Sequence, residues 1–138
     1  MIDSIRKARF GFTKLIVDDE EAMATYYAEV YGLNKLQRVT AGDDAIMGQL
    51  REVIMGPGDA VGAESLVIVK FLDRPAPRDR EAILGFITDD LDALMDRAIA
   101  NGGQLLGPLR SMPEHGVRVQ FTTDPEGRVS ENVELITG

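Results

Sequence analysis

The chain repeats one local pattern at a fixed spacing. In each repeat a short apolar stretch runs into two consecutive aspartates and then into a segment with helical periodicity that ends at glycine. The two repeats occupy residues 14–33 and 83–103. Asp18 lies 71 residues before Asp89, and Gly32 lies 71 residues before Gly103. A fixed period of this kind indicates an internal duplication, so the chain is expected to fold as two similar supersecondary modules.

The first repeat predicts a strand followed by a capped helix. Residues 12–17 are rich in aromatic and β-branched side chains, which is typical of a strand. Asp18 or Asp19 is expected to cap the helix, because an aspartate accepts hydrogen bonds from the free amides of the first turn, and Glu21 fits a capping box. Gly32 is expected to end the helix because glycine readily adopts the left-handed conformation.

Further strands follow each helix. The strands expected after the first helix are residues 35–40, 46–55 and 65–72, and the second half repeats the plan with a strand at 83–88, a helix capped by Asp89, and strands at 104–106, 117–122 and 132–136. Both halves read β-α-β-β-β. We therefore expect an α+β fold in a single domain, residues 1–138. Its parts are module 1 at about 10–72, a proline-bearing charged linker at 73–82, and module 2 at about 83–138.

Composition limits the partners. The 138 residues carry a net charge of −8, which makes nucleic acid a poor partner and favours a neutral or cationic small molecule. Cysteine is absent, so disulfides, thiolate zinc sites and a cysteine nucleophile are excluded. The sequence lacks the run of about 18 apolar residues that a membrane helix needs, and its start lacks the apolar stretch of a signal peptide. We expect a cytoplasmic protein with no membrane partner.

The ordered set of motifs resembles one known superfamily. The motifs are Tyr26-Tyr27 with Val30-Tyr31-Gly32 in the first half, and Asn101-Gly102-Gly103, Asp124-Pro125-Glu126-Gly127 and "VELI" in the second half. From about Phe12 to Ile136 the chain resembles the vicinal oxygen chelate superfamily, which includes glyoxalase I, bleomycin-resistance proteins and extradiol dioxygenases. The resemblance implies two βαβββ modules whose sheets curl around a cavity, commonly in a homodimer whose chains both contribute to each site.

The resemblance also implies where a metal would bind. Glyoxalase-type members hold a divalent metal on four inward-pointing side chains drawn from His, Gln and Glu. In this chain the matching positions are Phe12, Ile83, Val69 or Lys70, and Glu134. Of these only Glu134 is an ordinary ligand, because the apolar side chains have no donor atom and lysine is normally protonated. We therefore expect no intrinsic metal and no cofactor, with a divergent metal site as the alternative.

A lysine–glutamate pair is the expected substitute for the metal. Strand alternation groups Phe12, Lys14 and Ile16 on one face of the first strand, and Asn132, Glu134 and Ile136 on one face of the last strand. A lysine that faces a partly buried cavity needs a carboxylate, so Lys14 or Lys70 is expected to pair with Glu134. The alternative is a one-residue shift in register, which would leave these lysines in solvent.

Other candidate residues have two readings each. His115, the only histidine, lies in the segment "RSMPEHG" near the expected cavity mouth, where it is either a general acid or base or a surface residue. A single histidine also argues against an extradiol dioxygenase, which needs two on its iron. The three tyrosines of the first helix either stack on an aromatic ligand or pack on the sheet. Met47, Arg51 and Met55 share one face of the strand at 46–55, which either lines a pocket or belongs to the core.

Two functions follow from these observations. The first is a bleomycin-resistance-like protein that binds a small organic molecule in a metal-free cavity. Its ligand-binding residues are expected to be Phe12, Lys14, Arg51, Lys70 and Asn132. The alternative is a lactoylglutathione-lyase-like lyase or isomerase that uses Glu134 or His115 as acid or base, either without metal or with a divergent metal site.

Overall fold

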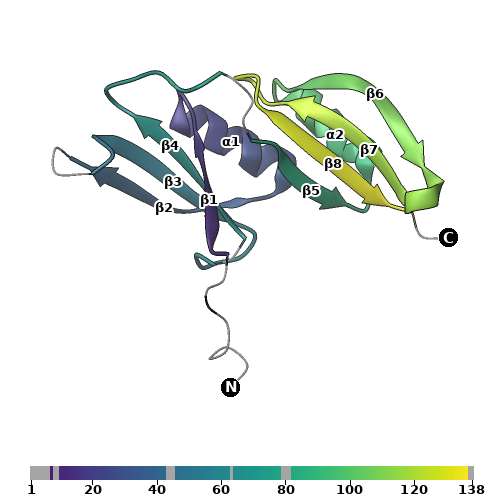
Figure 1. Ribbon diagram of the computed structural model, residues 1–138, viewed down its shortest axis with the longest axis horizontal. Helices are drawn as coiled ribbons and strands as arrows, with labels where there is room; N and C mark the ends of the chain where they lie inside the picture. Colours follow the sequence, from purple (N-terminus) through teal and green to yellow (C-terminus); the bar gives the residue numbers. More distant parts are fainter. Residues whose placement is uncertain (1–6, 8–9, 43–45, 63, 79–81, 137–138) are drawn as a thin grey trace.

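The chain forms two modules of the same topology (Figure 1). A computed structural model describes residues 7, 10–42, 46–62, 64–78 and 82–136. The first module contains β1 (Phe12–Ile16), α1 (Glu20–Tyr31), β2 (Asn34–Ala41), β3 (Leu50–Gly56) and β4 (Ser65–Phe71). The second contains β5 (Leu84–Thr88), α2 (Leu91–Ala100), β6 (Gln104–Met112), a short 3₁₀ turn (Pro113–His115), β7 (Val117–Thr123) and β8 (Val129–Leu135). The α+β fold of two βαβββ modules is confirmed.

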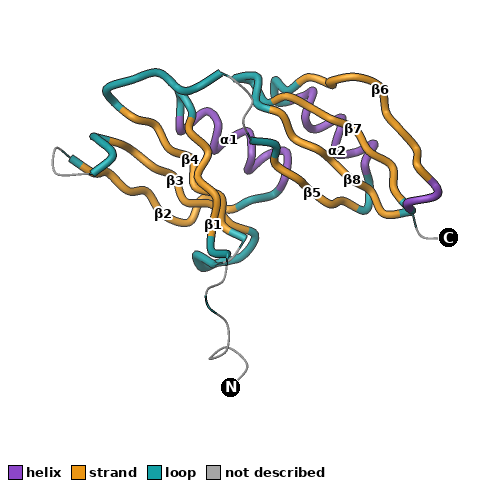
Figure 2. Tube along the Cα trace, in the orientation of Figure 1, coloured by secondary structure: helices purple, strands orange, loops and turns teal. Residues whose placement is uncertain are grey.

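The two sheets have the same strand order. The first sheet runs β1-β4-β3-β2 and the second runs β5-β8-β7-β6. In each sheet the first strand of the module is parallel to the last, and the other neighbouring strands are antiparallel. In each module the helix therefore connects its first strand to the far edge of the same sheet, as Figure 2 shows in purple between the orange strands.

Aspartates cap both helices, but the second is not the expected one. The Asp19 carboxylate accepts a hydrogen bond from the Ala22 amide at 3.0 Å, which settles the choice in the first module. In the second module the cap is Asp90, whose carboxylate accepts from the Ala93 amide at 3.1 Å, so the expected cap Asp89 is wrong. Each helix begins one residue after its cap, and the 71-residue period holds for the true caps.

The helix ends differ between the modules. Gly32 follows α1 in the left-handed conformation with φ of 73°, as expected. After α2 the left-handed residue is Gly102, with φ of 92°, rather than Gly103. A Cβ atom on Gly103 would lie 2.6 Å from the Tyr26 hydroxyl, so this glycine is needed for close packing between the modules.

Several predicted strands have different bounds, and the last of them, β8, begins at Val129 rather than at residue 132. The third strand begins at Leu50 rather than at residue 46, because Ile46 and Met47 lie in a turn and are exposed. Met47, Arg51 and Met55 were expected to share one face of this strand. Of these three residues, Met55 is buried in the core. In the second module β6 continues to Met112 through an irregularity between Leu106 and Arg110, well beyond the expected end. The predicted linker at 73–82 lies partly outside the described residues.

One core joins the modules. It combines the inner sides of α1 and α2 with the helix-facing sides of β1, β3 and β4. The guanidinium of Arg97 on α2 donates to the Val30 carbonyl at the end of α1 at 3.0 Å, so the two helices lie side by side. Neither helix of the described chain has the length and apolarity that crossing a lipid bilayer requires.

Candidate functional site

Each sheet packs one face against the helices and turns the other away from them. In the first sheet Leu15, Val53 and Ile68 point into the core that contains α1. Strand alternation places Ile16, Ile54 and Val69 on the opposite side, where they join a second apolar cluster. We call this second side the helix-free face. Phe12 and Lys14 belong to it because they alternate with Leu15 along β1.

The floor of this face is apolar and well packed. Its buried members are Leu50, Val67, Val69 and Phe71, and Ile16, Ala41 and Ile54 pack against them. Phe12 lies at the margin of the floor with 52% of its surface exposed. The Arg74 guanidinium covers the Phe71 ring at 3.9 Å, so one end of the floor is closed by a cation–π contact.

An ion pair interrupts the apolar floor. The Lys14 ammonium lies 2.6 Å from a carboxylate oxygen of Glu52 on β3. Only 8% of the Glu52 side chain is exposed, whereas 47% of the Lys14 side chain is exposed. The ammonium also lies 6.0 Å from the centre of the Phe12 ring. Lys14 is therefore anchored from below by a buried carboxylate and flanked by an aromatic ring.

Lys14 thus has a carboxylate partner, but a different one from the partner expected. Glu134 faces α2 instead: its carboxylate accepts from the Leu91 amide at 2.7 Å and pairs with Arg118 at 3.3 Å. The expected pairing of Glu134 with a lysine is therefore wrong. Glu52 could not be found from local sequence, because it meets Lys14 only through the pairing of both β1 and β3 with β4.

Three other predicted ligand-binding residues also lie on the helix sides of the sheets. Asn132 is fully buried and accepts a hydrogen bond from the Tyr31 hydroxyl at 2.7 Å. The Arg51 guanidinium pairs with Glu20 at the start of α1 at 2.6 Å. Lys70 alternates with Val69 and Phe71, so it points away from the helix-free face. The structure therefore brings only Phe12 and Lys14 of the predicted set together.

The second sheet presents a carboxylate that the sequence analysis missed. Glu131 lies opposite Gly85 and Phe121 in the register of β8, and it alternates with the helix-facing Asn132. It is half-buried, and its carboxylate makes no hydrogen bond or ion pair within the described chain. The signal that could have found it is the start of β8 at Val129, because a strand that begins there includes Glu131, and alternation with Asn132 turns its side chain away from α2.

Exposed apolar side chains accompany Glu131. Ile87 on β5 is 75% exposed and Leu135 on β8 is 56% exposed. Ile83, just before β5, is 58% exposed. His115 lies in the exposed 3₁₀ turn between β6 and β7, and it makes no hydrogen bond within the described residues. The apolar side chains on the helix-free face of the second module are therefore more exposed than the buried floor of the first.

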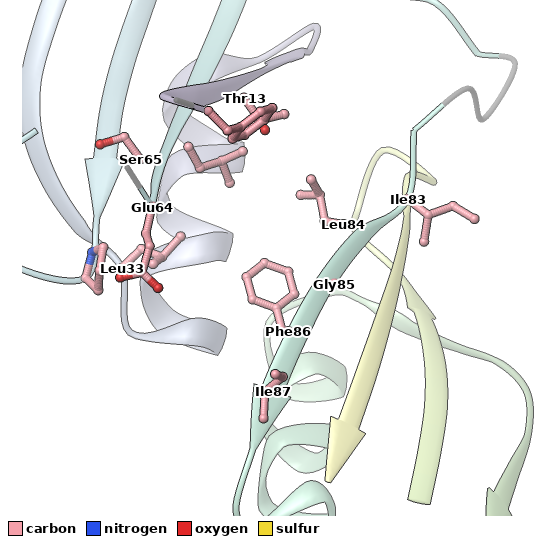
Figure 3. A pocket seen from close by; sticks show the side chains of 12 residues that line it. Thr13, Leu33, Glu64, Ser65, Ile83, Leu84, Gly85, Phe86 and Ile87 are labelled. Atoms are coloured by element: carbon pink, nitrogen blue, oxygen red, sulfur yellow. The ribbon is translucent and has the colours of Figure 1, made fainter. Parts of the chain in front are cut away.

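A cleft of about 600 Å³ separates the two modules at the start of β1 and along β5 (Figure 3). Leu84 and Phe86 project into it from β5, and Thr13 and Leu66 line its other wall. The Phe86 ring, which lines the cleft, also stacks on the Tyr31 ring with centroids 3.6 Å apart. The tyrosines thus pack in the junction between the modules, as the packing alternative of the sequence analysis predicts.

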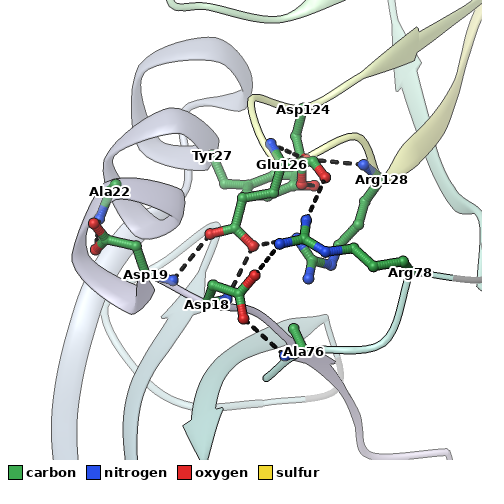
Figure 4. Close-up of polar contacts among 9 residues, drawn as sticks. All are labelled: Asp18, Asp19, Ala22, Tyr27, Ala76, Arg78, Asp124, Glu126 and Arg128. Carbon is green, nitrogen blue, oxygen red and sulfur yellow. Dashed lines mark hydrogen bonds and ion pairs between the residues drawn. The ribbon is translucent and has the colours of Figure 1, made fainter. Parts of the chain in front are cut away.

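A polar network ties the second module to the start of α1 (Figure 4). The Glu126 carboxylate accepts hydrogen bonds from the amides of Asp18 and Asp19, each at 2.9 Å. Arg128 donates to the same carboxylate at 2.6 Å. Asp18 in turn accepts from the Ala76 amide at 2.7 Å. This network holds the segment that connects the two modules in contact with each module.

Hydrogen bonds and burial favour the ionised form of Asp18 and the neutral form of Tyr27. The Ala76 amide lowers the pKa of the Asp18 carboxyl, assisted by the nearby Arg78 guanidinium, while desolvation opposes the shift. The Tyr27 hydroxyl donates to the buried Asp124 carboxylate at 2.9 Å. Burial raises the pKa of Tyr27 well above its ordinary value, and the negative charge of Asp124 adds to this. All these groups face one another, so the network is structural rather than open to a ligand.

The residues at the implied metal positions do not fit a metal. Phe12, Ile83 and Val69 carry no donor atom, and Lys70 points to the helix side of its sheet. The remaining position, Glu134, is bonded to the Leu91 amide and to Arg118. Nowhere in the described chain do three or more His, Cys, Asp or Glu residues gather to hold a metal ion. One carboxylate cannot supply the three or four protein ligands of a divalent metal site.

Comparisons with known proteins agree with the fold. A family model described as "Glyoxalase/Bleomycin resistance protein/Dioxygenase superfamily" matches residues 9–131. Among curated protein sequences, none matches the chain. A glyoxalase family protein from Bacillus cereus superposes with a TM-score of 0.80 at 19% identity, covering 96% of this chain and 97% of that chain.

Two further solved structures show the same fold. Glyoxalase I from Zea mays superposes with a TM-score of 0.69 at 16% identity over 94% of this chain, which spans 45% of the maize protein. A glyoxalase/bleomycin resistance protein from Albidiferax ferrireducens gives a TM-score of 0.63 at 19% identity, covering 92% of this chain and 98% of that chain. At these identities the likeness concerns the fold.

Proposed function

Because the chain belongs to the Glyoxalase/Bleomycin resistance protein/Dioxygenase superfamily, we propose that it binds a small organic molecule against its helix-free faces, without a resident metal. Phe12 and Lys14 contact this molecule in the first module. Arg51, Lys70 and Asn132 leave the proposed binding set because they serve the helix sides of the sheets. The proposal is of the bleomycin-resistance type: the protein sequesters its ligand and does not transform it.

One observation carries this proposal. Exposed apolar side chains occupy positions where the family's metal ligands would stand: Phe12 is 52% exposed and Ile83 is 58% exposed. An exposed phenylalanine beside a buried apolar floor offers a surface for an aromatic or aliphatic ligand, because burial of that surface is favourable. The same residues cannot coordinate a cation. The residue types at these positions therefore favour an organic ligand over a metal.

We further propose that two chains pair to complete each site. Ile87 and Leu135 on the helix-free face of the second module are too exposed for a face that remains in water. A second chain that covers them would enclose a ligand between the two faces. Replacing Ile87 with Asp is then expected to convert dimers into monomers in sedimentation velocity, whereas Ile99→Asp on the outer side of α2 leaves the dimer intact.

A cytoplasmic location fits the charge and the lack of cysteine.

The first experiment measures metal and ligand binding together. Protein purified without chelators is assayed for metal, then melted with Ni²⁺, Zn²⁺, Mn²⁺ or Fe²⁺ and with a panel of aromatic compounds. A ligand at a hundredfold excess over its dissociation constant raises stability by about 2.7 kcal/mol. We expect shifts with organic compounds only. Stoichiometric metal whose stabilising effect is lost in Glu131→Ala would overturn the proposal.

A pair of variants locates the ligand. Phe12 lies on the helix-free face, whereas Phe10 lines the cleft between the modules. Phe12→Ala is expected to weaken the compound that gives the largest shift, and Phe10→Ala to leave it unchanged. The reverse result would move the site into the cleft of Figure 3.

The enzyme alternative has a structural observation of its own. Glu131 is a carboxylate without a partner in the described chain, so it is a better general base than Glu134, which the Leu91 amide and Arg118 engage. A lyase or isomerase of the superfamily would lose turnover in Glu131→Gln while retaining binding. Glu134→Ala and His115→Ala test the two residues expected from the sequence. Absence of turnover with substrates of the superfamily would leave the binding function.

A further inference from the structure

The Lys14–Glu52 pair is not required by the fold. In the second module Gly85 occupies the place of Lys14, five residues before the cap of its helix, and Val119 occupies the place of Glu52 at the matching register of the neighbouring strands. The same sheet is therefore built there without either charge. A buried ion pair generally adds little stability compared with apolar side chains of similar volume. The pair in the first module thus calls for a reason other than folding.

The geometry leaves part of the ammonium group available. Glu52 accepts from Lys14 at 2.6 Å, and in the described chain no other acceptor is bonded to this ammonium. An ammonium has three N–H donors, so two remain for water or a ligand. The Lys14 side chain is 47% exposed, and its position is fixed from below by a carboxylate that is 8% exposed. Lys14 is therefore a positioned hydrogen-bond donor on an apolar face.

We propose that Lys14 donates a hydrogen bond to an uncharged oxygen, such as a ketone carbonyl, of an aromatic ligand whose ring packs on Phe12. This inference rests on the proposed function, since it names the ligand class of the same site. The carbonyl oxygen takes a free N–H of Lys14, and the ion pair with Glu52 stays intact. The aromatic ring covers the exposed side of Phe12 and part of the apolar floor.

Charge explains why the ligand is neutral. A cationic ligand would have to displace Lys14 from Glu52 and leave the ammonium without its partner. An anionic ligand gains little, because Glu52 already neutralises Lys14 and the chain carries a net charge of −8. A neutral acceptor forms a charge-assisted hydrogen bond without either cost. The pair therefore selects against both signs of charge.

Four matched probes test the inference by fluorescence titration. They share a naphthalene ring and differ in one group: acetylnaphthalene, ethylnaphthalene, naphthoate and naphthylmethylamine. We expect the ketone to bind about tenfold more tightly than the hydrocarbon, because a hydrogen bond to a charged donor contributes on the order of 1.5 kcal/mol. The carboxylate and the amine are expected to bind more weakly than the ketone. A tighter amine, or equal affinities for all four probes, would overturn the inference and leave the proposed function standing.

A set of variants tests whether the Lys14–Glu52 pair causes the preference for the ketone. Lys14→Met combined with Glu52→Leu removes both charges, as in the second module, and is expected to bind ketone and hydrocarbon equally. Glu52→Gln leaves Lys14 with an uncompensated charge and should transfer the preference from the ketone to naphthoate. Lys35→Met, an exposed lysine bonded to Thr25, is the matched control and should keep the ketone preference. A preference that survives the double variant would refute the role of Lys14. Failure of every probe to bind the wild type would reject the proposed function as well.

Discussion

Tyr26 and Tyr27 are neighbours in the sequence and both are buried, but their hydroxyl groups have different surroundings. The Tyr27 hydroxyl donates to the Asp124 carboxylate at 2.9 Å, and that carboxylate also accepts the amides of Glu126 and Arg128. The Tyr26 hydroxyl has no hydrogen-bond partner in the described chain. A partnered and an unpartnered phenol thus stand side by side in one helix.

This difference predicts opposite effects of removing each oxygen. Tyr27→Phe is expected to lower the free energy of unfolding by about 1–3 kcal/mol, because Asp124 is left buried with one donor fewer. Tyr26→Phe removes a buried hydroxyl that loses its hydration on folding and gains no hydrogen bond in return. The free energy of unfolding should therefore stay the same or rise by up to about 1 kcal/mol. Urea unfolding measures both. Equal losses in the two variants would contradict this assignment.

At the same scale, single residues of the site were only partly predictable. Phe12 and Lys14 were assigned to one face because alternation along one strand is a local property. Glu52 and Glu131 were missed because the face on which each lies depends on which residues β3 and β8 pair with. A shift by an odd number of residues exchanges the two faces of a strand. Local sequence does not contain that pairing.

At the scale of elements, both helices were predicted from period and capping, but the doubled aspartates obscured the true cap. Either aspartate of an Asp-Asp pair can begin a helix, and the choice depends on the strand before it. In the second module β5 ends at Thr88, whose hydroxyl accepts from the Asp90 amide at 3.1 Å. This contact fixes the turn so that Asp90 rather than Asp89 reaches the first turn of α2.

The adjacent aspartates allow a matched test of the cap. Asp90→Ala removes the acceptor for the Ala93 amide and is expected to cost about 1 kcal/mol of stability. Asp89→Ala changes an exposed side chain with no hydrogen bond in the described residues, so its cost should stay below about 0.5 kcal/mol. Thermal unfolding of the two variants at the same pH gives the comparison. A larger loss for Asp89→Ala would restore the cap expected from the sequence.

At the scale of the whole molecule, the 71-residue period predicts two equivalent modules but not how they dock. The period says that each module repeats the same plan, and both sheets bear this out. The docking depends on contacts between side chains far apart in the sequence: Phe86 on Tyr31, Asn132 on Tyr31, and Glu126 on the amides before α1. Each of these contacts occurs only once, so the periodic pattern of the sequence does not predict them.

The three tyrosines make this docking sensitive to alkaline pH. They are the only tyrosines of the chain, tryptophan is absent, and all three lie in the junction. Burial raises the pKa of Tyr26, Tyr27 and Tyr31 above the ordinary value near 10. The unfolded chain therefore releases these protons near pH 10 while the folded chain retains them. Their contribution to stability is complete below about pH 10 and is lost as pH rises toward the folded-state pKa values.

Above about pH 10 the free energy of unfolding should fall by up to about 1.4 kcal/mol per pH unit for each tyrosine. The tyrosinate absorbance should then appear together with the loss of circular dichroism, as one cooperative transition, because the phenols ionise only when the junction opens. Titration of the unfolded chain in urea supplies the reference near pH 10. Tyrosinate absorbance that rises near pH 10 with the circular dichroism unchanged would mean that the phenols reach water in the native state. The modules would then not be docked through α1 as the contacts of Tyr27 and Tyr31 require.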